Sequence, residues 1–312
     1  MNATSKIKAK ALELGFSKVG VAKAEELTIE GRRLQEWLGK GYHATMGWMS
    51  ENPEKRTDPT RVLSNAKSVV SVAMNYFTPQ VHSTDPEVGK ISRYAWGDDY
   101  HIVVTERLEL LRDFILSELP RVQAKLYVDT GPVMDKAWAQ RAGIGWIGKH
   151  TNLITKEFGS WVFLGEIILD AALEYDEPFL DFCGSCKACI DACPTQAIVD
   201  EYQVDSNKCI SYLTIEHRGE LPSALTPKFE QWVYGCDICQ DVCPWNRFQQ
   251  ATSEQSFHPR DVNKAPLLRE LAPMKSEDFS NRFCRSPIKR TKHAGLTRNA
   301  KVILDSRKKK AT

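Results

Sequence analysis

Apolar and polar residues alternate with two different periods along the first half of the chain. Apolar residues that recur every three or four positions predict helices at residues 5–14, 28–38, 99–119 and 133–141. Segments rich in apolar residues without that period predict strands at residues 18–22, 68–76, 125–129 and 161–169. Asp98 is the expected N-cap of the third helix, and Pro120 ends it. Because helices alternate with strands up to about residue 172, we expect a layered α/β domain.

The chain changes character after residue 172. Residues 181–245 contain eight of the nine cysteines, short segments and two Cys-Pro pairs, and the residues beyond 250 are polar, interrupted by proline and finally basic. We therefore expect three parts: an α/β (α+β) domain at 1–172, a ferredoxin-like module at 173–250 and a short, basic, mostly helical segment at 251–312.

The composition narrows the class of protein. With 312 residues, of which 42% are hydrophobic and 26% charged, the chain is not collagen-like, coiled-coil or wholly disordered. No apolar run approaches the roughly 18–20 residues of a membrane span. The start of the chain, with Lys6, Lys8 and Lys10, lacks the pattern of a signal peptide. We therefore expect a cytoplasmic monomer without membrane contact, whose grouped cysteines bind metal and do not form disulfides.

The near-neutral net charge of +2 hides an uneven distribution. Residues 281–312 contain 11 Lys or Arg and one acidic residue, Asp305, so this segment carries +10. The first 280 residues contain 31 basic and 39 acidic residues and carry −8. An acidic body with a basic end suggests a polyanionic partner at one edge of the protein, and a solvated tail is the alternative.

The cysteine spacing predicts two iron–sulfur clusters. The run C-x-x-C-x-x-C-x-x-x-C-P at residues 183–194 is that of bacterial ferredoxins, in which three thiolates bind one cubane and the fourth binds the other. A second set at 236–244 lacks its first cysteine, which Cys209 can replace. The crossover rule then assigns Cys183, Cys186, Cys189 and Cys243 to cluster one, and Cys193, Cys209, Cys236 and Cys239 to cluster two.

Two structural zinc sites are the alternative, because C-x-x-C pairs also form Cys₄ zinc sites. The three-cysteine run with its trailing Cys-Pro favours the cubane. Cys284 is left over, and we interpret it as a structural or incidental thiol. Cubanes carry single electrons, so this part indicates redox chemistry without identifying a substrate.

Residues 143–148 match the G-x-G-x-x-G pattern of dinucleotide-binding proteins, but in the wrong context. Such a site needs a strand before the glycines and a helix after them. Here a predicted helix precedes the motif and a β-like segment at 151–155 follows it, so we reject NAD binding. The glycines still allow a close approach of the backbone to another group.

Asp129 is a candidate carboxylate for catalysis. It ends a predicted strand and opens the turn Thr130-Gly131-Pro132, at an edge where α/β folds bind ligands. An Asx-turn or a helix cap is the alternative, and the turn alone favours it. Asp99-Tyr100-His101 begins like the D-x-H-x-x-G motif of some cobalamin mutases, but Val104 replaces the glycine. We therefore interpret His101 as a helix-face residue and not as a cobalt ligand.

Several of these motifs occur, in this order, together with others in one known family. They lie at residues 54–56, 92–101, 128–132, 142–149, 183–195, 209–214, 234–244 and 286–290. On these residues the chain resembles the epoxyqueuosine reductases, cobalamin-dependent iron–sulfur enzymes of tRNA queuosine biosynthesis, over about residues 5–300.

The resemblance implies a reaction. In this family the epoxide of epoxyqueuosine, at the wobble position of the tRNA anticodon, is reduced to the alkene of queuosine, and the oxygen leaves as water. Electrons from an external low-potential donor pass through two 4Fe-4S clusters to base-off cobalamin, which the family binds in its N-terminal domain. A reductive dehalogenase or a related reductase of small molecules is the alternative. A plain electron carrier would leave residues 1–172 without a role.

The resemblance also implies roles for individual residues. By position, Asp129 matches the proton donor of the family, which reverses the preference for a turn residue. The expected contacts to tRNA phosphates are Lys289, Arg290 and Lys292. Longer family members continue into helical repeats that help to hold tRNA; here either the grip is weaker or residues 307–310 compensate. The positions expected to line cobalamin are Arg56, Ser92, Asp129, His150, Leu153, Leu164, Ile210 and Ser211.

Overall fold

The computed structural model describes the backbone of residues 2–311 and the side chains of residues 2–307. At its centre lies a sheet in the order β1-β2-β7-β4, formed by β1 (Lys18–Lys23), β2 (Ser68–Asn75), β7 (Val162–Leu169) and β4 (Ala124–Tyr127). All neighbouring strands are antiparallel. The alternation of helices and strands along the chain is confirmed. The sheet is of the α+β type, however, because the segment between β1 and β2 leaves and re-enters the sheet at the same end, which makes the two strands antiparallel.

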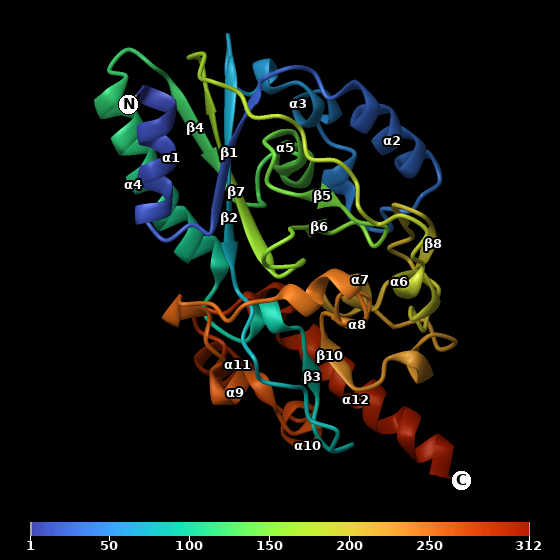
Figure 1. The fold of residues 1–312 in the computed structure, drawn as a ribbon. Coiled ribbons are helices and arrows are strands. Elements are labelled where there is room, and N and C mark those ends of the chain that lie inside the picture. Colours follow the sequence, from blue (N-terminus) through green and yellow to red (C-terminus); the bar gives the residue numbers. More distant parts are fainter. Residues whose placement is uncertain (1, 312) are drawn as a thin grey trace.

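Helices cover both faces of this sheet (Figure 1). Successive residues of β7 point to opposite faces. Phe163 and Ile167 belong to the apolar cluster that includes α1 (Ala3–Glu13) and α4 (Tyr100–Glu118). Ile168 belongs to the cluster on the other face, which includes α5 (Asp135–Arg141). The helices α2 (Thr28–Gly39) and α3 (Pro53–Thr57) lie on the α5 side (Figure 1). The four predicted helices and four predicted strands are therefore present, with their ends shifted by at most two residues.

The prediction that Asp98 caps the long helix is wrong. The N-cap of α4 is Asp99, whose carboxylate accepts a hydrogen bond from the backbone N–H of His101 (3.1 Å). The carboxylate of Asp98 instead accepts a hydrogen bond from Nε of Arg260 (3.0 Å). This partner lies 162 residues further along the chain, so the local pattern around the helix start could not indicate it.

The G-x-G-x-x-G segment forms a tight hairpin after α5. β5 (Trp146–Ile147) pairs in antiparallel fashion with β6 (Leu153–Ile154). A Cβ atom on Gly145 would lie 2.1 Å from the carbonyl oxygen of Ile154, so only glycine allows the two strands to approach this closely. The close approach expected for these glycines is therefore made by the chain itself. The helix before the motif and the strand after it match the inverted context that argued against NAD binding.

Apart from the long helix α12 (Lys292–Ala311), the remaining half of the chain forms short elements, most of them in the lower part of the molecule (Figure 1). The cysteine-rich part contains α6 (Ala188–Asp191), β8 (Ile198–Asp200), β9 (Gln203–Val204), α7 (Ile210–Ile215), β10 (Trp232–Tyr234) and α8 (Ile238–Asp241). β10 pairs in parallel with β3 (Lys90–Ile91). The helices that follow are α9 (Asp261–Lys264), α10 (Leu268–Leu271), α11 (Ser276–Arg282) and α12 (Lys292–Ala311). Within residues 2–311, no helix combines the length and the apolar character needed to cross a membrane.

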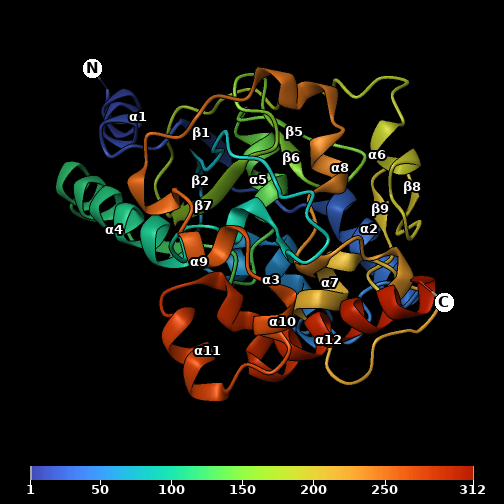
Figure 2. The same ribbon diagram turned by 90° about the horizontal axis from the view of Figure 1, so that it is seen from below.

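One apolar cluster joins segments that are far apart in the sequence. It contains Trp96, Leu213, Trp232, Phe283 and Leu296. Figure 2 shows α7, α10 and α12 side by side where this cluster lies, and α12 contacts both other helices. All three predicted parts of the chain contribute to this cluster. The predicted boundaries at residues 172 and 250 stay predictions.

Candidate active site

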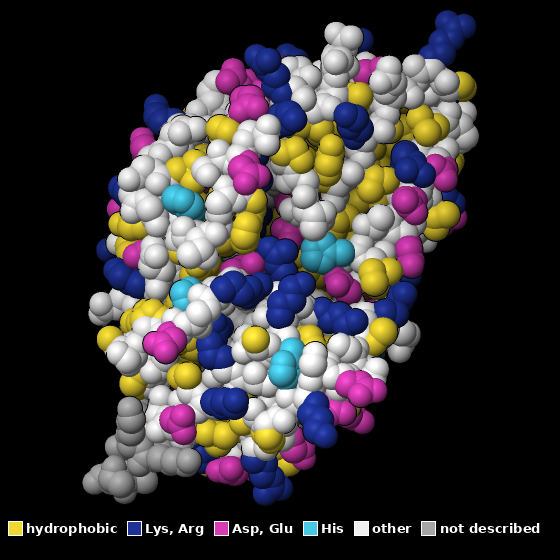
Figure 3. Space-filling model, turned by 180° about the vertical axis from the view of Figure 1, so that it is seen from behind, with side chains coloured by type: hydrophobic (Ala, Val, Ile, Leu, Met, Phe, Trp, Pro, Cys, Tyr) yellow, Lys and Arg dark blue, Asp and Glu magenta, His cyan; other side chains and the backbone are white. Residues whose placement is uncertain are grey.

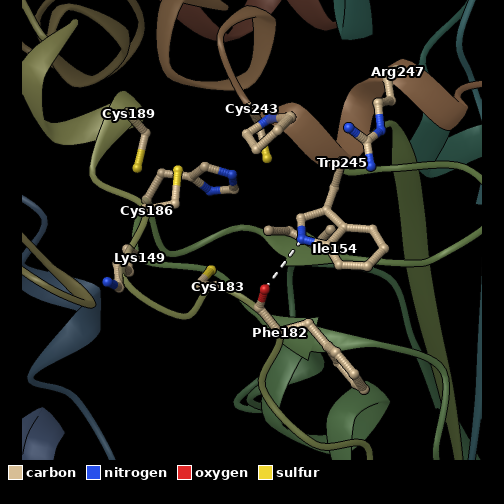
Figure 4. Close-up of a pocket in the computed structure, with 11 residues that line it drawn as sticks. Lys149, Ile154, Phe182, Cys183, Cys186, Cys189, Cys243, Trp245 and Arg247 are labelled. Atoms are coloured by element: carbon tan, nitrogen blue, oxygen red, sulfur yellow. Dashed lines mark hydrogen bonds between the residues drawn. The ribbon is translucent and has the colours of Figure 1, made fainter.

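Four cysteines from two distant segments face one cavity of about 210 Å³ (Figure 4). Cys183, Cys186 and Cys189 come from the loop before α6 and from α6 itself, and Cys243 follows α8. The helices α6 and α8 contact each other, which brings Cys243 next to the first run. The structure thus places together the four cysteines that the crossover rule assigns to cluster one.

The other four cysteines of the two sets lie on the wall of a second cavity, of about 400 Å³: Cys193, Cys209, Cys236 and Cys239. Burial raises the pKa of Cys209 and holds the pKa of Cys236 well above its ordinary value. In the first cavity, burial and the neighbouring thiols raise the pKa of Cys189 to about 11. Buried thiols of this kind ionise when a metal centre stabilises the thiolate. Both sets therefore fit cationic metal centres.

Each set offers the four thiols that a Cys₄-bound cubane requires. Cys284 is exposed and lines neither cavity.

The larger cavity lies where strands of the central sheet end. β2 and β4 end on this side of the sheet, and β7 begins there because it is antiparallel to both. Tyr76, Asp129 and Val162 line the cavity from these three strand ends. The opposite wall belongs to the cysteine-rich part, where α7 and α8 contribute. The cavity therefore lies between the sheet edge and the cysteines of the predicted second cluster.

Seven of the eight positions expected to line cobalamin lie on the wall of this cavity. Arg56 does not: its guanidinium donates a hydrogen bond to the carbonyl oxygen of Trp48 (2.8 Å). Burial lowers the pKa of Arg56, and the nearby carboxylate of Asp135, which does line the cavity, opposes that shift. The seven that do line the cavity are Ser92, Asp129, His150, Leu153, Leu164, Ile210 and Ser211.

His150 offers a hydrogen-bond donor at the cavity wall. Its Nδ1 accepts a hydrogen bond from the backbone N–H of Asn152 (3.2 Å), which leaves the proton of the neutral ring on Nε2. Nε2 is buried and has no partner among the described residues. Burial lowers the pKa of His150 to about 4, so the ring is neutral at pH 7. This N–H is therefore available to a ligand.

Asp129 is held in place by residues at the start of α4. The hydroxyl of Tyr100 donates a hydrogen bond to Oδ2 of Asp129 (2.8 Å), and Nε2 of His101 lies 3.4 Å from the same oxygen. Nδ1 of His101 lies 2.8 Å from Oδ1 of Asp99. The backbone of Asp129 adopts a left-handed φ of 58°, which Asp tolerates better than most residues. Its side chain, 61% exposed, borders the open cavity.

These contacts set the charges at the cavity wall. The contact with His101 lowers the pKa of Asp129 and, together with Tyr100, outweighs the opposing effect of partial desolvation at the cavity rim. Burial lowers the pKa of His101, but Asp129 and Asp99 outweigh burial and raise it to about 9. At neutral pH the site therefore holds an imidazolium next to a carboxylate.

The sequence pattern did not indicate Tyr100 and His101 as site residues. Both lie at the start of a helix, as expected, but their contact with Asp129 spans 28–29 residues and has no local signature. The available signal was the spacing Asp99-x-His101, which places a carboxylate beside an imidazole. That carboxylate binds the histidine, and the histidine in turn faces the candidate acid.

Comparisons with known proteins identify the family. A family model of the 4Fe-4S double cluster binding domain matches residues 182–246, and a model described as epoxyqueuosine reductase QueG, DUF1730 matches residues 56–130. The epoxyqueuosine reductase of Synechocystis sp. is 49% identical over 290 residues, which cover 92% of this chain and all of the relative. This chain belongs to the epoxyqueuosine reductase family.

Other members of the family agree with this assignment. The epoxyqueuosine reductase of Escherichia coli is 42% identical over 96% of this chain and 80% of the relative. A crystal structure of epoxyqueuosine reductase with a tRNA-Tyr epoxyqueuosine-modified stem loop has a TM-score of 0.92 and 35% identity, covering 98% of this chain and 82% of that one. The epoxyqueuosine reductase of Streptococcus thermophilus has a TM-score of 0.89 and 32% identity, over the same shares. Membership of the family makes this chain an oxidoreductase that acts on tRNA.

The residues expected to contact tRNA in this family member lie at the start of α12. Lys289 and Arg290 belong to a short 3₁₀ helix (Pro287–Thr291), and Lys292 begins α12. All three are exposed. Figure 3 shows Lys and Arg side chains gathered beside a hollow on one face of the molecule. Lys289 and Lys292 have no carboxylate partner within the described residues.

Arg290 and Arg307, two other basic residues of this segment, already pair with carboxylates. Nε of Arg290 lies 2.7 Å from the carboxylate of Glu216, and its guanidinium lies over the ring of Trp48. The guanidinium of Arg307 lies 2.7 Å from Glu87. The side chains of residues 308–310, which were expected to strengthen the grip on tRNA, lie outside the described residues.

Proposed function

We propose that this protein reduces the epoxide of epoxyqueuosine in the anticodon of tRNA to the alkene of queuosine. The proposal rests on one observation: Asp129 and the four cysteines of the predicted second cluster line the same cavity. A group that handles protons thus lies on the same cavity as a site that delivers electrons. The names of the relatives and the solved complex with an epoxyqueuosine-modified stem loop support this substrate.

The cofactors of the proposal are two 4Fe-4S clusters and cobalamin. The unpartnered Nε2–H of His150 and the hydroxyl of Ser211 fit the amide-bearing edge of cobalamin, and Leu153, Leu164 and Ile210 fit its apolar faces. When bound, the clusters would carry single electrons from an external low-potential donor, and cobalamin would supply low-valent cobalt chemistry at this cavity. We assign this cofactor to residues 1–172, where they face the ferredoxin-like module, and the clusters to residues 173–250.

Within this proposal, Asp129 protonates the oxygen that leaves the ring. Its carboxylate borders the cavity, and Tyr100 fixes the orientation of that carboxylate. Because the pKa of Asp129 is lowered by its neighbours, the resting carboxylate is ionised, and the imidazolium of His101 is its adjacent proton source. General acid catalysis of this kind typically contributes about 10²–10⁴-fold to the rate.

The basic start of α12 provides the proposed grip on tRNA. Lys289 and Lys292 are free to pair with phosphates, whereas Arg290 would have to exchange Glu216 for a phosphate. Phosphate contacts of this kind give affinity that depends on salt and little on sequence. A base of the anticodon loop is already accessible, so it can turn into the cavity at low cost.

The experiment is an anaerobic incubation of the cluster-loaded protein with cobalamin, a chemical low-potential reductant and tRNA that contains epoxyqueuosine. We expect nucleoside mass spectrometry to show queuosine in place of epoxyqueuosine. The same tRNA without cobalamin, and the protein without reductant, are the controls. If protein with a full complement of clusters leaves epoxyqueuosine unchanged, the proposal is wrong.

A further inference from the structure

Glu166 is a buried carboxyl group at the centre of the sheet that the reaction described above leaves without a role. It lies in β7, opposite Ser71 of β2 and Tyr127 of β4, and its side chain is completely buried. Like Ile168, it points to the face that α5 covers. Its Oε1 accepts a hydrogen bond from the hydroxyl of Ser71 (3.2 Å). Its Oε2 is buried and has no donor among the described residues.

The group that faces Glu166 is another carboxyl. Asp135 begins α5 and lines the larger cavity, and its carboxyl faces that of Glu166, close enough for a side-chain hydrogen bond. Two ionised carboxylates have only acceptors, so a hydrogen bond between them requires a proton on one of them. An unpaired buried oxygen is costly, and a shared proton gives Oε2 of Glu166 its missing partner.

The surroundings of the pair favour the retention of that proton. Burial, followed by Asp135, holds the pKa of Glu166 well above its ordinary value. Burial also raises the pKa of Asp135 to about 6, against the effect of Glu166. Of the charged groups around the pair, Asp129 raises the pKa of Asp135, whereas Lys136 and Arg56 lower it. Carboxyls that interact this strongly titrate as a unit and lose their two protons at well separated pH values.

The proposed reaction needs two protons, and Asp129 is ionised at rest. Removal of the epoxide oxygen breaks two C–O bonds, forms one C=C bond and two O–H bonds, and consumes two electrons and two protons. The external reductant provides the electrons. The imidazolium of His101 accounts for one proton through Asp129, and a second proton has to reach the same oxygen before water leaves.

We propose that Asp135 and Glu166 share one proton at neutral pH and that this proton passes across the cavity to Asp129, as the second proton of the reduction. The transfer of this proton rests on the proposed function, whereas the sharing of the proton does not. In the balanced sequence, Asp129 gives the first proton as the first C–O bond breaks, regains a proton from the pair, and gives it as the second C–O bond breaks and water forms. Solvent protons then restore the pair through the open cavity.

Infrared spectroscopy of the protein without substrate tests the shared proton directly. We expect the wild type to show the C=O band of a protonated carboxyl at pH 7–8, shifted in D₂O. Glu166→Gln, which has nearly the same shape, should lack this band, and Asp135→Asn should also alter it. The control Glu109→Gln, on an exposed face of α4, should retain the band. Identical spectra of folded wild type and Glu166→Gln would show that both carboxyls are ionised and would overturn the inference.

Steady-state kinetics on modified tRNA tests the transfer. For Glu166→Gln we expect kcat to fall by about 10²-fold or more, with an unchanged KM. At constant pH, increasing concentrations of imidazolium buffer should restore part of the kcat, which a purely structural role would not allow. A normal kcat in a variant that lacks the infrared band would show that the shared proton is not delivered. If neither the wild type nor any variant converts the modified tRNA, although the wild type shows the infrared band, the proposed function is wrong and the shared proton is still supported.

Discussion

Nε2 of His101 lies 3.4 Å from Oδ2 of Asp129, at the edge of the cavity that the second set of cysteines also lines. The same ring is anchored from its other side by Asp99, whose Oδ1 lies 2.8 Å from Nδ1. One cation thus lies between two carboxylates, and one of these borders the space where the substrate is proposed to bind. This arrangement holds Asp129 ionised and keeps a proton next to it.

The first prediction concerns the acid itself. Asp129→Asn keeps the size of the side chain but removes its ability to carry a proton to the oxygen. We expect turnover to fall by about 10²–10⁴-fold, while iron content and cobalamin binding stay unchanged. The control is Asp113→Asn, an exposed position of α4. Near-normal turnover by Asp129→Asn would show that the proton comes from another group.

The second prediction concerns the dependence of stability on pH. Folding raises the pKa of His101 from 6.5 to about 9. A group with a raised pKa stabilises the folded state fully at pH below 6.5, and this contribution disappears as the pH rises through about 9. Urea unfolding should therefore show that the difference in free energy of unfolding between wild type and His101→Phe decreases from pH 6 to pH 9.5. A difference that is constant over this range would mean that His101 is not charged in the folded protein.

The third prediction concerns the isolated cysteine of the second set. Cys209 replaces the ligand that residues 236–244 lack, and it lines the larger cavity with Cys193, Cys236 and Cys239. Cys209→Ala should lose one of the two clusters, so that anaerobically reconstituted protein contains about half of the wild-type iron and sulfide. Cys284→Ala, at an exposed cysteine outside both cavities, should retain the full amount. Two intact clusters in Cys209→Ala would contradict the ligand assignment.

The fourth prediction concerns the basic segment. Lys289→Gln and Lys292→Gln remove cations that have no carboxylate partner within the described residues, so each should weaken tRNA binding. Each lost phosphate contact should also reduce the slope of log affinity against log salt by about 0.7–0.9. Arg290→Gln should have a smaller effect, because Arg290 is paired with Glu216. Arg121→Gln, beyond the end of α4, is the control, and cluster content should not change in any of these variants. A salt dependence that all four variants share with the wild type would place the tRNA elsewhere.

Much of the fold and of the cluster sites could be predicted because their signals are local. Periodicity located eight of the helices and strands of the first half, and cysteine spacing grouped Cys243 with Cys189, 54 residues earlier. Features that depend on distant partners could not be predicted in this way. Periodicity says nothing about the order or direction of strands, so the antiparallel sheet was not visible. The Arg260 side chain that engages Asp98 lies in another part of the chain, and the cap moved to Asp99.

The same distinction between local signals and distant partners applies to the candidate site. Asp129 could be singled out from its place at the end of a predicted strand and from the resemblance, and seven of the eight expected lining residues share one cavity. Arg56 interacts instead with the carbonyl of Trp48. Tyr100, His101 and the pair of Asp135 with Glu166 were missed because their contacts join α4 to Asp129, which follows β4, and α5 to β7. Contacts of this kind exist only once the chain is folded.

The ratio of queuosine to epoxyqueuosine, after anaerobic incubation of modified tRNA with the fully loaded protein, tests the proposed reduction most directly. We expect the wild type to convert epoxyqueuosine to a nucleoside lighter by one oxygen atom, and Asp129→Asn, with the same iron and cobalamin content, to do so far more slowly. Unchanged epoxyqueuosine with the loaded wild type would contradict it.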